Sequence, residues 1–486
     1  MSEATTRDAL IIGTGFGAMV ALKALRSAGL EDIVFLERRA FLGGTWPQNS
    51  YPGAAVDVQS PLYSLAGEPW DWSRLYAERD ELVAYTEHLL SKLGVRERAV
   101  TGANVASLEW SDDDQLWTAS CRDGRVFRAR YVVSASGPLS QPSVPEWPGQ
   151  ETFAGETWHT NAWRHDVPLA GKRVAVIGSG ASAAQVIPAI APEVEHLHVF
   201  QRTPHWVLPR RDRVLTERQR ALMRWPSVYR LVRRLIYWSI EYRIIGLCYV
   251  PRLLDRMGRR PALRHLEDQV DDGSMREKLT PSYTIGCKRV IVSSTLFPAL
   301  TRSNVTLHAR DDAITAFTPE GVTTASGASV DVDIVVYATG YNATNGSIPY
   351  EVVGRGQTLA EAWSSFPRAY LGTTLPGFPN LFLIGGPNTG IGHTSALFVF
   401  ESQARYIERC LRRSRASGCP IAPTAEAEER YTSWIHRALE GTVWSAGGCR
   451  SWYQGESGRV IAIFPGFSFL YRWMCQRFRL SDHVLG

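Results

Sequence analysis

The chain has 486 residues, which is too many for one hydrophobic core, so we expect two or three domains. Its composition, with 44% hydrophobic and 21% charged residues, is ordinary for a globular protein, and a net charge of +5 over this length does not favour nucleic-acid binding. The seven cysteines are scattered and show neither CxxC nor metal-ligand spacing, so we expect no disulfide framework, zinc site or dithiol redox centre.

A first dinucleotide-binding pattern lies at the start of the chain. The apolar strand Ala9 to Ile12 runs into the sequence GTGFGA, which is followed by a helical run to Ala28. Glycines in this turn let the backbone approach a pyrophosphate, which the helix N-terminus faces. The next strand, Asp32 to Leu36, ends at Glu37, whose carboxylate can accept hydrogen bonds from ribose hydroxyls. The pattern predicts an FAD site that includes Gly13, Gly15, Phe16, Gly17, Ala18 and Glu37.

No targeting or membrane segment is predicted. The chain reaches its first strand without a basic and then apolar leader, so we expect no signal peptide. It has no run of about 18 uncharged apolar residues, so we expect no membrane span and a cytoplasmic protein.

The stretch from Phe41 to Ser60 follows the first nucleotide pattern. It holds two adjacent glycines, a tryptophan, a Tyr-Pro-Gly turn and an aspartate at Asp57. We interpret it as the segment that lays down the flavin ring and places the Asp57 carboxylate beside the face where oxygen reacts. The predicted flavin contacts in and just after it are Gly44, Trp46, Asp57 and Tyr63.

Further strands and a proline-rich segment come next. Leu75 to Leu93 is predicted to be helical, and Val105 to Val133 to form strands around an Asp-Gly turn. The segment Pro138 to Pro148 is typical of a domain linker. We therefore expect a discontinuous FAD-binding domain made of residues 1–145 and 340–486.

A second dinucleotide-binding pattern begins at Arg173. The strand Arg173 to Ile177 leads into GSGASA and a helix, and the strand His196 to Phe200 ends in Gln-Arg-Thr rather than in an acid. An acidic residue there would repel a 2′-phosphate, whereas Arg202 can pair with it. The pattern predicts an NADPH-binding domain over residues 146–339. Its predicted contacts here are Gly178, Gly180, Ala181, Ser182, Arg202 and Thr203.

A helical insertion, at about 210–280, is rich in Arg and bulky apolar side chains. We favour a helical subdomain that packs on the nucleotide domain, and a substrate-facing lid or a membrane-surface patch is the alternative. The pairs Arg233–Arg234 and Arg259–Arg260 are expected to be solvated.

The C-terminal part returns to the first domain. Val332 to Tyr337 is a largely apolar strand, and a long helix is expected from about His393 to Arg413. The start of that helix favours negative charge and suits the electron-rich pyrimidine edge of a reduced flavin. The tail, Trp434 to Gly486, is expected to cover the active site or an interface. Further FAD contacts are expected at Gly386 and Asn388.

Two longer motifs carry a resemblance to a known family. The pattern GGxWxxxx(F/Y)PGxxxD is matched at every fixed position, and so is FxGxxxHxxxW. The second motif continues with Pro or Asp in the family, whereas Arg164 stands here. Over nearly its whole length, the chain resembles the type I Baeyer–Villiger monooxygenases, which are class B flavoprotein monooxygenases. The matching residues are Gly43, Gly44, Trp46, Tyr51, Pro52, Gly53, Asp57, Phe153, Gly155, His159 and Trp163.

The resemblance implies an α/β fold with two Rossmann-like domains, one for FAD and one for NADPH. It also implies a reaction in which NADPH reduces FAD and O2 forms a C4a-peroxyflavin. One oxygen atom is then inserted beside a ketone carbonyl, giving an ester or a lactone.

Family positions also imply residue roles. Arg289 matches the catalytic arginine, which also contacts NADPH, and Asp57 would hold its guanidinium, so we expect these two side chains to lie close together. Lys288 matches the lysine that joins Arg202 and Thr203 at the 2′-phosphate. Trp452 matches a position that contacts the nicotinamide cofactor, and His159 is expected to be structural.

Other functions stay open. N- or S-oxygenation by the same peroxyflavin is the main alternative; Trp163 favours Baeyer–Villiger chemistry over it, and Arg164 weakens that preference. A disulfide reductase-like enzyme shares both nucleotide folds but needs a dithiol. A nucleotide-binding protein without catalysis would have no use for Asp57, Lys288 and Arg289. The sequence predicts neither the particular ketone nor the oligomeric state.

Overall fold

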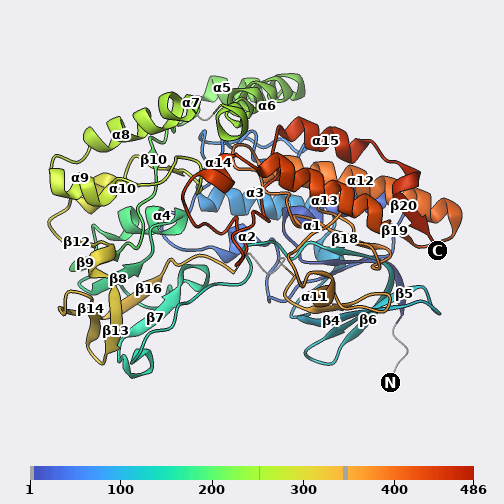
Figure 1. Cartoon of the computed structure of the whole chain (residues 1–486), viewed down its shortest axis with the longest axis horizontal. Helices are drawn as coiled ribbons and strands as arrows, with labels where there is room; N and C mark the ends of the chain where they lie inside the picture. The colour runs from blue at the N-terminus through green and yellow to red at the C-terminus, as the bar shows by residue number, and fades with distance from the viewer. Residues whose placement is uncertain (1–4, 251, 343–347) are drawn as a thin grey trace.

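The structure is a computed structural model that describes residues 5–250, 252–342 and 348–486. Two sheets lie side by side in the lower half of the molecule in Figure 1, and most of the longer helices lie above them. This arrangement confirms the predicted α/β class.

The larger sheet combines parallel strands with an antiparallel edge. It contains β1 Thr6–Ile12, β2 Ile33–Leu36, β3 Ala99–Val100, β4 Val105–Ser111, β5 Leu116–Cys121, β6 Val126–Ser134, β17 Glu351–Val353 and β18 Leu381–Leu383. The order is β17-β4-β5-β6-β1-β2-β3, and β18 also pairs with β6. Strand β1 is parallel to β2 and β6, whereas β5 is antiparallel to β4 and β6. Residues from both ends of the chain therefore share one sheet.

Helix α1, Phe16–Ser27, follows β1 as the first nucleotide pattern predicts. Gly13 has φ +103°, and a Cβ there would lie 2.5 Å from the carbonyl oxygen of Ala135, so only glycine fits this turn. A Cβ at Gly17 would lie 2.8 Å from a methyl carbon of Ile384, because α1 packs closely against the segment after β18.

The second sheet is parallel throughout its described strands. It contains β7 Glu156–His159, β8 Arg173–Ile177, β9 His196–Phe200, β12 Val305–His308 and β16 Ile334–Tyr337. Its order is β12-β9-β8-β16-β7, with α4 Ala181–Ile190 following β8. The bounds of β8 and β9 are those predicted from the sequence. A small antiparallel sheet of β13 Ile314–Thr318, β14 Gly321–Thr324 and β15 Ser329–Asp331 lies beside it.

After β16 the chain returns to the larger sheet and then forms the C-terminal helices. These elements are α11 Leu359–Ala362, α12 Ala396–Ser417, β19 Ile421–Pro423, α13 Ala425–Leu439, α14 Val443–Ala446, α15 Ser468–Gln476 and β20 His483–Leu485. Helix α12 begins three residues later than the predicted His393, because the Ser395 side chain accepts a hydrogen bond from the backbone N–H of Leu397 and caps the helix.

Further elements lie outside these two sheets. They are α2 Thr45–Gln48, α3 Arg79–Lys92, β10 Val207–Leu208, β11 Ile291–Val292 and α10 Leu296–Leu300. Strands β10 and β11 pair in parallel, and this pairing positions the segment that contains Arg289.

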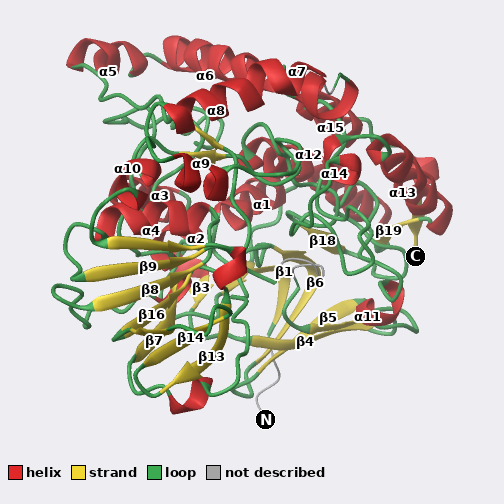
Figure 2. Cartoon of the chain, turned by 60° about the vertical axis from the view of Figure 1, so that its left-hand side comes forward, coloured by secondary structure: helices red, strands yellow, loops and turns green. Residues whose placement is uncertain are grey.

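The first helices of the insertion, α5 to α7, lie along the top of the molecule in Figure 1 and along its upper edge in the turned view of Figure 2. It contains α5 Glu217–Met223, α6 Pro226–Glu241, α7 Arg252–Leu254, α8 Arg260–Glu267 and α9 Gly273–Leu279. Helix α6 packs on segments from both ends of the chain, since Tyr237 and Ile240 cluster with Leu62 and with Phe398 of α12. These contacts of α6 are thus with residues outside the range 146–339, and the division into domains stays a prediction.

One disulfide bond corrects the expectation drawn from cysteine spacing. Cys287 and Cys449 are joined across a separation of 162 residues. Cys287 is buried and Cys449 is half-buried. Cysteine spacing reveals pairs that are close in sequence, whereas this pair is formed by the fold. The free cysteines among the described residues are Cys121, Cys248, Cys410, Cys419 and Cys475.

Neither a membrane-spanning helix nor a metal cluster occurs in residues 5–250, 252–342 and 348–486. None of their helices combines the length and apolar character needed to cross a bilayer. They also contain no cluster of three or more His, Cys, Asp or Glu side chains arranged to hold a metal ion.

Candidate active site

Asp57 and Arg289 form a two-point ion pair between distant segments of the chain. The Arg289 Nε donates to one Asp57 carboxylate oxygen at 2.7 Å, and Nη2 donates to the other at 2.8 Å. The predicted proximity of these side chains, 232 residues apart, is confirmed. About a third of each side chain is exposed, 35% for Arg289 and 31% for Asp57, so a ligand can reach the pair.

The Asp57 carboxylate keeps the Arg289 guanidinium positively charged. The Asp57 carboxylate, more than any other group, raises the pKa of Arg289 above its ordinary value. The guanidinium is therefore a cation at neutral pH and well above it. Its two parallel hydrogen bonds also fix its orientation.

Asp57 is positioned by contacts with the other nucleotide fold. Gly53 has φ +80°, and a Cβ there would lie 2.5 Å from the carbonyl oxygen of Gln185 in α4. The Tyr51 hydroxyl donates to the Gln185 side-chain oxygen at 3.0 Å, and the Gln185 amide donates to the Ala55 carbonyl at 2.9 Å. The Tyr-Pro-Gly motif therefore docks the segment that carries Asp57 onto α4.

An aromatic cluster lies beside Asp57. The Tyr63 ring makes edge contacts with Phe16 and Trp46, with ring centroids 6.0 and 5.8 Å apart. Burial, reinforced by Asp57, raises the pKa of Tyr63 to about 12, so its hydroxyl stays protonated. Three residues assigned to flavin binding from the sequence thus lie in one cluster next to the ion pair.

The first nucleotide site has the shape and polarity that FAD requires. A Cβ at Gly44 would lie 2.8 Å from the Cα of Gly15, so the two glycines leave the backbone of the turn uncovered by side chains. The buried Glu37 carboxylate stands at the end of β2, held by the Thr14 hydroxyl at 2.6 Å and the Arg39 N–H at 3.1 Å. Its remaining lone pairs can accept hydrogen bonds from ribose hydroxyls. Ala18 is fully buried in α1.

The start of α12 supplies a second indication that a polar group binds there. His393 Nδ1 and Thr394 Oγ1 are buried and have no hydrogen-bond partner among the described residues. Buried polar atoms are nearly always paired, so these two atoms suit the polar edge of a bound ring. The residues present therefore fit FAD.

The two other predicted FAD contacts lie in the loop between β18 and α12. A Cβ at Gly386 would lie 2.4 Å from the carbonyl oxygen of Gly372, which excludes any side chain. The Asn388 amide donates to the carbonyls of Val460 and Ile463 at 3.2 and 3.0 Å. The backbone N–H of Asn388 also donates, to the Ile461 carbonyl at 2.8 Å, so only the two oxygen atoms of Asn388 remain for a cofactor.

The second nucleotide site lies at the start of α4. A Cβ at Gly178 would lie 2.3 Å from the Ala338 carbonyl oxygen, whereas one at Gly180 would meet nothing within 4 Å. The tight turn thus sits against β16, and Gly180 faces open space at the helix N-terminus, where Ala181 and Ser182 begin the helix. The residues present fit a bound pyrophosphate.

Two cations lie together beside this site. Burial lowers the pKa of Lys288, and the nearby Arg202 lowers it further. Like charges brought together favour an anion between or beside them. Thr203 follows Arg202, and its carbonyl accepts a hydrogen bond from the Ser179 hydroxyl at 2.7 Å. The arrangement suits a 2′-phosphate. Trp452, the other predicted NADPH contact, lies on the C-terminal tail, is 40% exposed and has its ring 4.5 Å from that of Tyr453.

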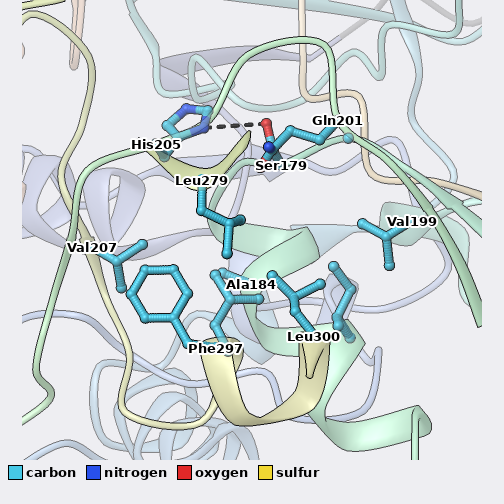
Figure 3. A pocket seen from close by; sticks show the side chains of 12 residues that line it. Ser179, Ala184, Val199, Gln201, His205, Val207, Leu279, Phe297 and Leu300 are labelled. Carbon is cyan, nitrogen blue, oxygen red and sulfur yellow. Dashed lines mark hydrogen bonds between the residues drawn. The ribbon is translucent and has the colours of Figure 1, made fainter. Parts of the chain in front are cut away.

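A mostly apolar pocket lies next to these cations (Figure 3). Val199, Phe297 and Leu300 line its apolar side, and Ser179, Gln201 and His205 form its polar edge. Burial lowers the pKa of His205 to about 4, and Lys288 adds to the effect, so the imidazole is neutral near pH 7.

His159 links the two chain crossings between the sheets. The backbone N–H of Asn161 donates to His159 Nδ1 at 3.1 Å, so Nε2 carries the proton and donates to the Gly340 carbonyl at 3.0 Å. This satisfies both ring nitrogens and agrees with a structural role. Arg164, which departs from the family pattern, is at the surface and pairs with Asp166 at 2.6 Å and Glu156 at 3.3 Å.

One buried polar cluster was not predicted. His393 Nε2 lies 3.2 Å from a carboxylate oxygen of Glu241, and the Ser468 hydroxyl donates to the same oxygen at 2.8 Å. It joins α6, α15 and the loop before α12. A signal was present in the sequence, because Glu241 is the acidic residue in a helix otherwise made of Arg, Ser, Pro and apolar residues.

The two nucleotide folds and the ion pair between them define a class of protein, the flavin-dependent oxidoreductases that use a pyridine nucleotide. A family model described as pyridine nucleotide-disulphide oxidoreductase matches residues 7–225. Cys287 and Cys449 lie outside that range, and Cys121 within it is a buried free cysteine.

Relatives and solved structures narrow the class. A Baeyer–Villiger monooxygenase of Pseudomonas aeruginosa is 40% identical, covering 98% of this chain and 90% of the relative. One from Streptomyces coelicolor is 39% identical, covering 97% and 91%. The chain belongs to the Baeyer–Villiger monooxygenases.

The fold comparison agrees. The structure of cyclohexanone monooxygenase from Rhodococcus sp. Phi1 bound to NADP+ matches with a TM-score of 0.87 and 30% identity, covering 99% of each chain. The complex of OTEMO with FAD and NADP matches with a TM-score of 0.88 and 26% identity, covering 100% of each chain.

Proposed function

We propose that this protein is an FAD- and NADPH-dependent monooxygenase that inserts one oxygen atom of O2 next to a ketone carbonyl, giving an ester or a lactone. The observation that carries the proposal is the two-point ion pair of Asp57 and Arg289, at 2.7 and 2.8 Å, on the border of the first nucleotide site. When bound, FAD and NADPH supply the reducing equivalents and the activation of O2.

The protein's own contribution is a fixed positive charge. Attack on a ketone carbonyl places negative charge on the carbonyl oxygen, and the Arg289 guanidinium can stabilise it without reorganising. Asp57 holds the planar group in one orientation through both hydrogen bonds. Because the pKa of Arg289 is raised, the group binds the developing oxyanion as a cation and donates hydrogen bonds rather than a proton.

The coenzyme preference is assigned to the second nucleotide site. Arg202, Thr203 and Lys288 would hold the 2′-phosphate, and the turn at Gly178 and Gly180 the pyrophosphate. Support comes from the shared electrostatics of Lys288 and Arg202 and from the open space at Gly180. Trp452 is proposed to border the nicotinamide.

The division into an FAD-binding unit of residues 1–145 and 340–486 and an NADPH-binding unit of residues 146–339 is also a proposal. It is supported by sheet membership, because β17 and β18 join the larger sheet, β7 to β16 pair only among themselves, and β19 pairs with β20. We further propose that the enzyme acts in the cytoplasm, where NADPH is available.

The decisive test replaces Arg289 with Ala in FAD-loaded protein. We expect the variant to oxidise NADPH while the yield of ester or lactone, followed by product mass, is lost. A sulfide offered in the same assay separates the alternative chemistry: dominant sulfoxide formation by the wild type would favour S-oxygenation. Ester formation that survives in the variant would overturn the role of Arg289.

A further inference from the structure

The outward face of α6 carries large apolar side chains at helical spacing. Leu231, Leu235 and Trp238 are 54%, 62% and 53% exposed, and Tyr242, directly after the helix, is 47% exposed. Steps of four, three and four residues place all of them on one side of the helix. A helix of a globular protein normally buries such a stripe, so this exposed stripe indicates a surface that binds a partner.

The stripe continues onto a second helix. The Trp238 ring packs against Phe469 of α15, with centroids 5.8 Å apart. Phe469 is 43% exposed, and Trp473, one turn further along α15, is 51% exposed. We call Leu231, Leu235, Trp238, Tyr242, Phe469 and Trp473 together the α6–α15 surface. Helices α6 and α15 both lie in the upper part of the molecule in Figure 1, above the two sheets.

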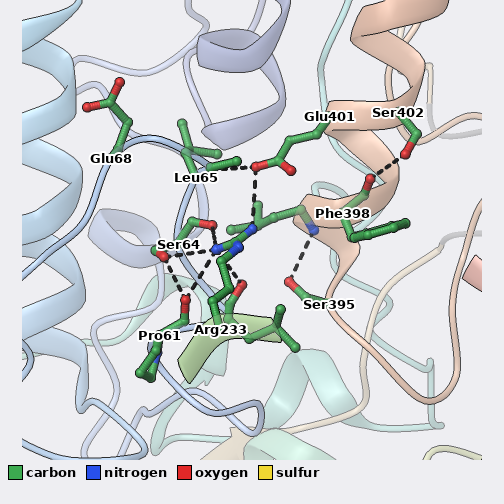
Figure 4. A network of polar contacts seen from close by, with 12 residues as sticks. Pro61, Ser64, Leu65, Glu68, Arg233, Ser395, Phe398, Glu401 and Ser402 are labelled. Atoms are coloured by element: carbon green, nitrogen blue, oxygen red, sulfur yellow. Dashed lines mark hydrogen bonds and ion pairs between the residues drawn. The ribbon is translucent and has the colours of Figure 1, made fainter. Parts of the chain in front are cut away.

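The opposite face of α6 is fastened to the protein, so the helix cannot turn to bury the stripe. Arg233 donates to the carbonyls of Pro61 and Leu62 at 3.2 Å and pairs with Glu401 of α12 at 3.5 Å (Figure 4). Tyr237 stacks on Phe398 with ring centroids 4.9 Å apart. Arg233 is therefore an anchor, and the expectation that it is solvated is wrong for this residue.

The exposed charges on α6 and directly after α6 and α15 are of one sign. Every exposed charged side chain of α6, a helix described from end to end, is an arginine, Arg230 or Arg234. Arg243 is exposed just after the helix, and Arg477 lies over the Trp473 ring at 4.9 Å. The acidic residue of α6, Glu241, is fully buried. Trp, Phe and Leu flanked by Arg is the composition of helices that lie in a membrane interface.

We propose that the α6–α15 surface docks the protein onto the headgroup region of a bilayer that contains anionic lipids. The aromatic and leucine side chains enter the interface, and Arg230, Arg234 and Arg243 pair with lipid phosphates. The helix lies in the plane of the membrane and does not span it. A second copy of the chain fits less well, because a two-fold contact would bring two arginine-rimmed surfaces together.

The test is vesicle flotation of the FAD-loaded full-length protein. Phosphatidylcholine vesicles are compared with vesicles that also contain phosphatidylglycerol. We expect the protein to float with the anionic vesicles and to be released by high salt, because the attraction is partly electrostatic. Trp238→Ser/Phe469→Ser/Trp473→Ser and, separately, Arg230→Glu/Arg234→Glu should each lower binding by about tenfold or more.

Matched controls come from the far side of the molecule. Val126→Ser removes an equally exposed apolar side chain (44%), and Arg128→Glu/Arg130→Glu reverses two exposed charges on β6. These should float like the wild type, and the flavin spectrum reports that every variant is folded. The proposal is overturned if no vesicle binding occurs, or if the α6–α15 variants bind like the controls. It is equally overturned if light scattering shows a dimer that those variants dissociate.

Discussion

Cys287 and Cys449 are joined by a disulfide that brings together the two segments carrying Arg289 and Trp452. Arg289 follows Cys287 by two residues, and Trp452 follows Cys449 by three. The bond therefore links the segment of the proposed catalytic arginine directly to the tail that borders the proposed nicotinamide site.

The first prediction concerns this bond. In oxidised protein, Cys287→Ala/Cys449→Ala should lower the free energy of unfolding in urea by up to about 5 kcal/mol, because a closure of 162 residues is lost. Alkylation of unfolded protein should modify two more thiols after reduction than before it. Reductant should destabilise the wild type and leave the double variant unchanged; equal sensitivity in both would refute the assignment.

The second prediction concerns the charge of Arg289. Its raised pKa means that the cation and its ion pair persist as the pH rises, and would be lost only above that pKa. Wild-type product yield should therefore show no loss attributable to this group on the alkaline side. Arg289→Lys should introduce one, because a lysine beside the site titrates at lower pH. A matched control, Arg164→Lys, changes a surface arginine and should not alter the profile.

Asp57 allows a third prediction. Asp57→Asn keeps the shape of the side chain but removes the charge that orients Arg289, so ester formation should fall by about 100-fold to 1,000-fold. NADPH oxidation should be much less affected, which shifts the balance towards uncoupled turnover. The ratio of product to NADPH consumed measures this directly, and an unchanged ratio would contradict the positioning role of Asp57.

The fourth prediction concerns coenzyme choice. Arg202→Ala or Lys288→Ala should raise KM for NADPH by about tenfold to a hundredfold, since each removes a charged hydrogen-bond donor to the 2′-phosphate. NADH lacks that phosphate, so its KM should stay nearly constant. A parallel rise in both KM values would show that these residues serve the nucleotide site in general.

The fifth prediction concerns acid stability. Burial lowers the pKa of His198 and of His205 to about 4, and that of His159 below 6.5. A histidine with a lowered pKa in the folded state binds more protons when unfolded, so its stability contribution is present above about 6.5 and is lost as the pH falls towards 4. Urea midpoints should decline over this window. His205→Asn should show a shallower decline, and an identical slope would argue against its contribution.

Patterns local in sequence predicted much of the fold. The glycine turns, Glu37 and Arg202 each lie at or just after the end of a strand in the sequence, so a local pattern predicts them. The strand from Arg173 to Ile177 has its predicted bounds. Contacts between residues far apart in the sequence were harder to predict. The contact of Asp57 with Arg289 was predicted from the resemblance to the family, whereas no motif or family position predicted the contacts of Cys287 with Cys449 and of Glu241 with His393. Their separations of 162 and 152 residues leave no periodic signal.

The contact between Gly53 and Gln185 limits how this enzyme can be recombined. With 2.5 Å between a Cβ at residue 53 and the Gln185 carbonyl oxygen, the loop of one half and the helix of the other are fitted to each other. A chimera that exchanges residues 146–339 between two relatives must therefore keep the partners of Tyr51, Gly53 and Ala55 together. The two surfaces that meet at this site must therefore be exchanged together, because neither half keeps the contact on its own.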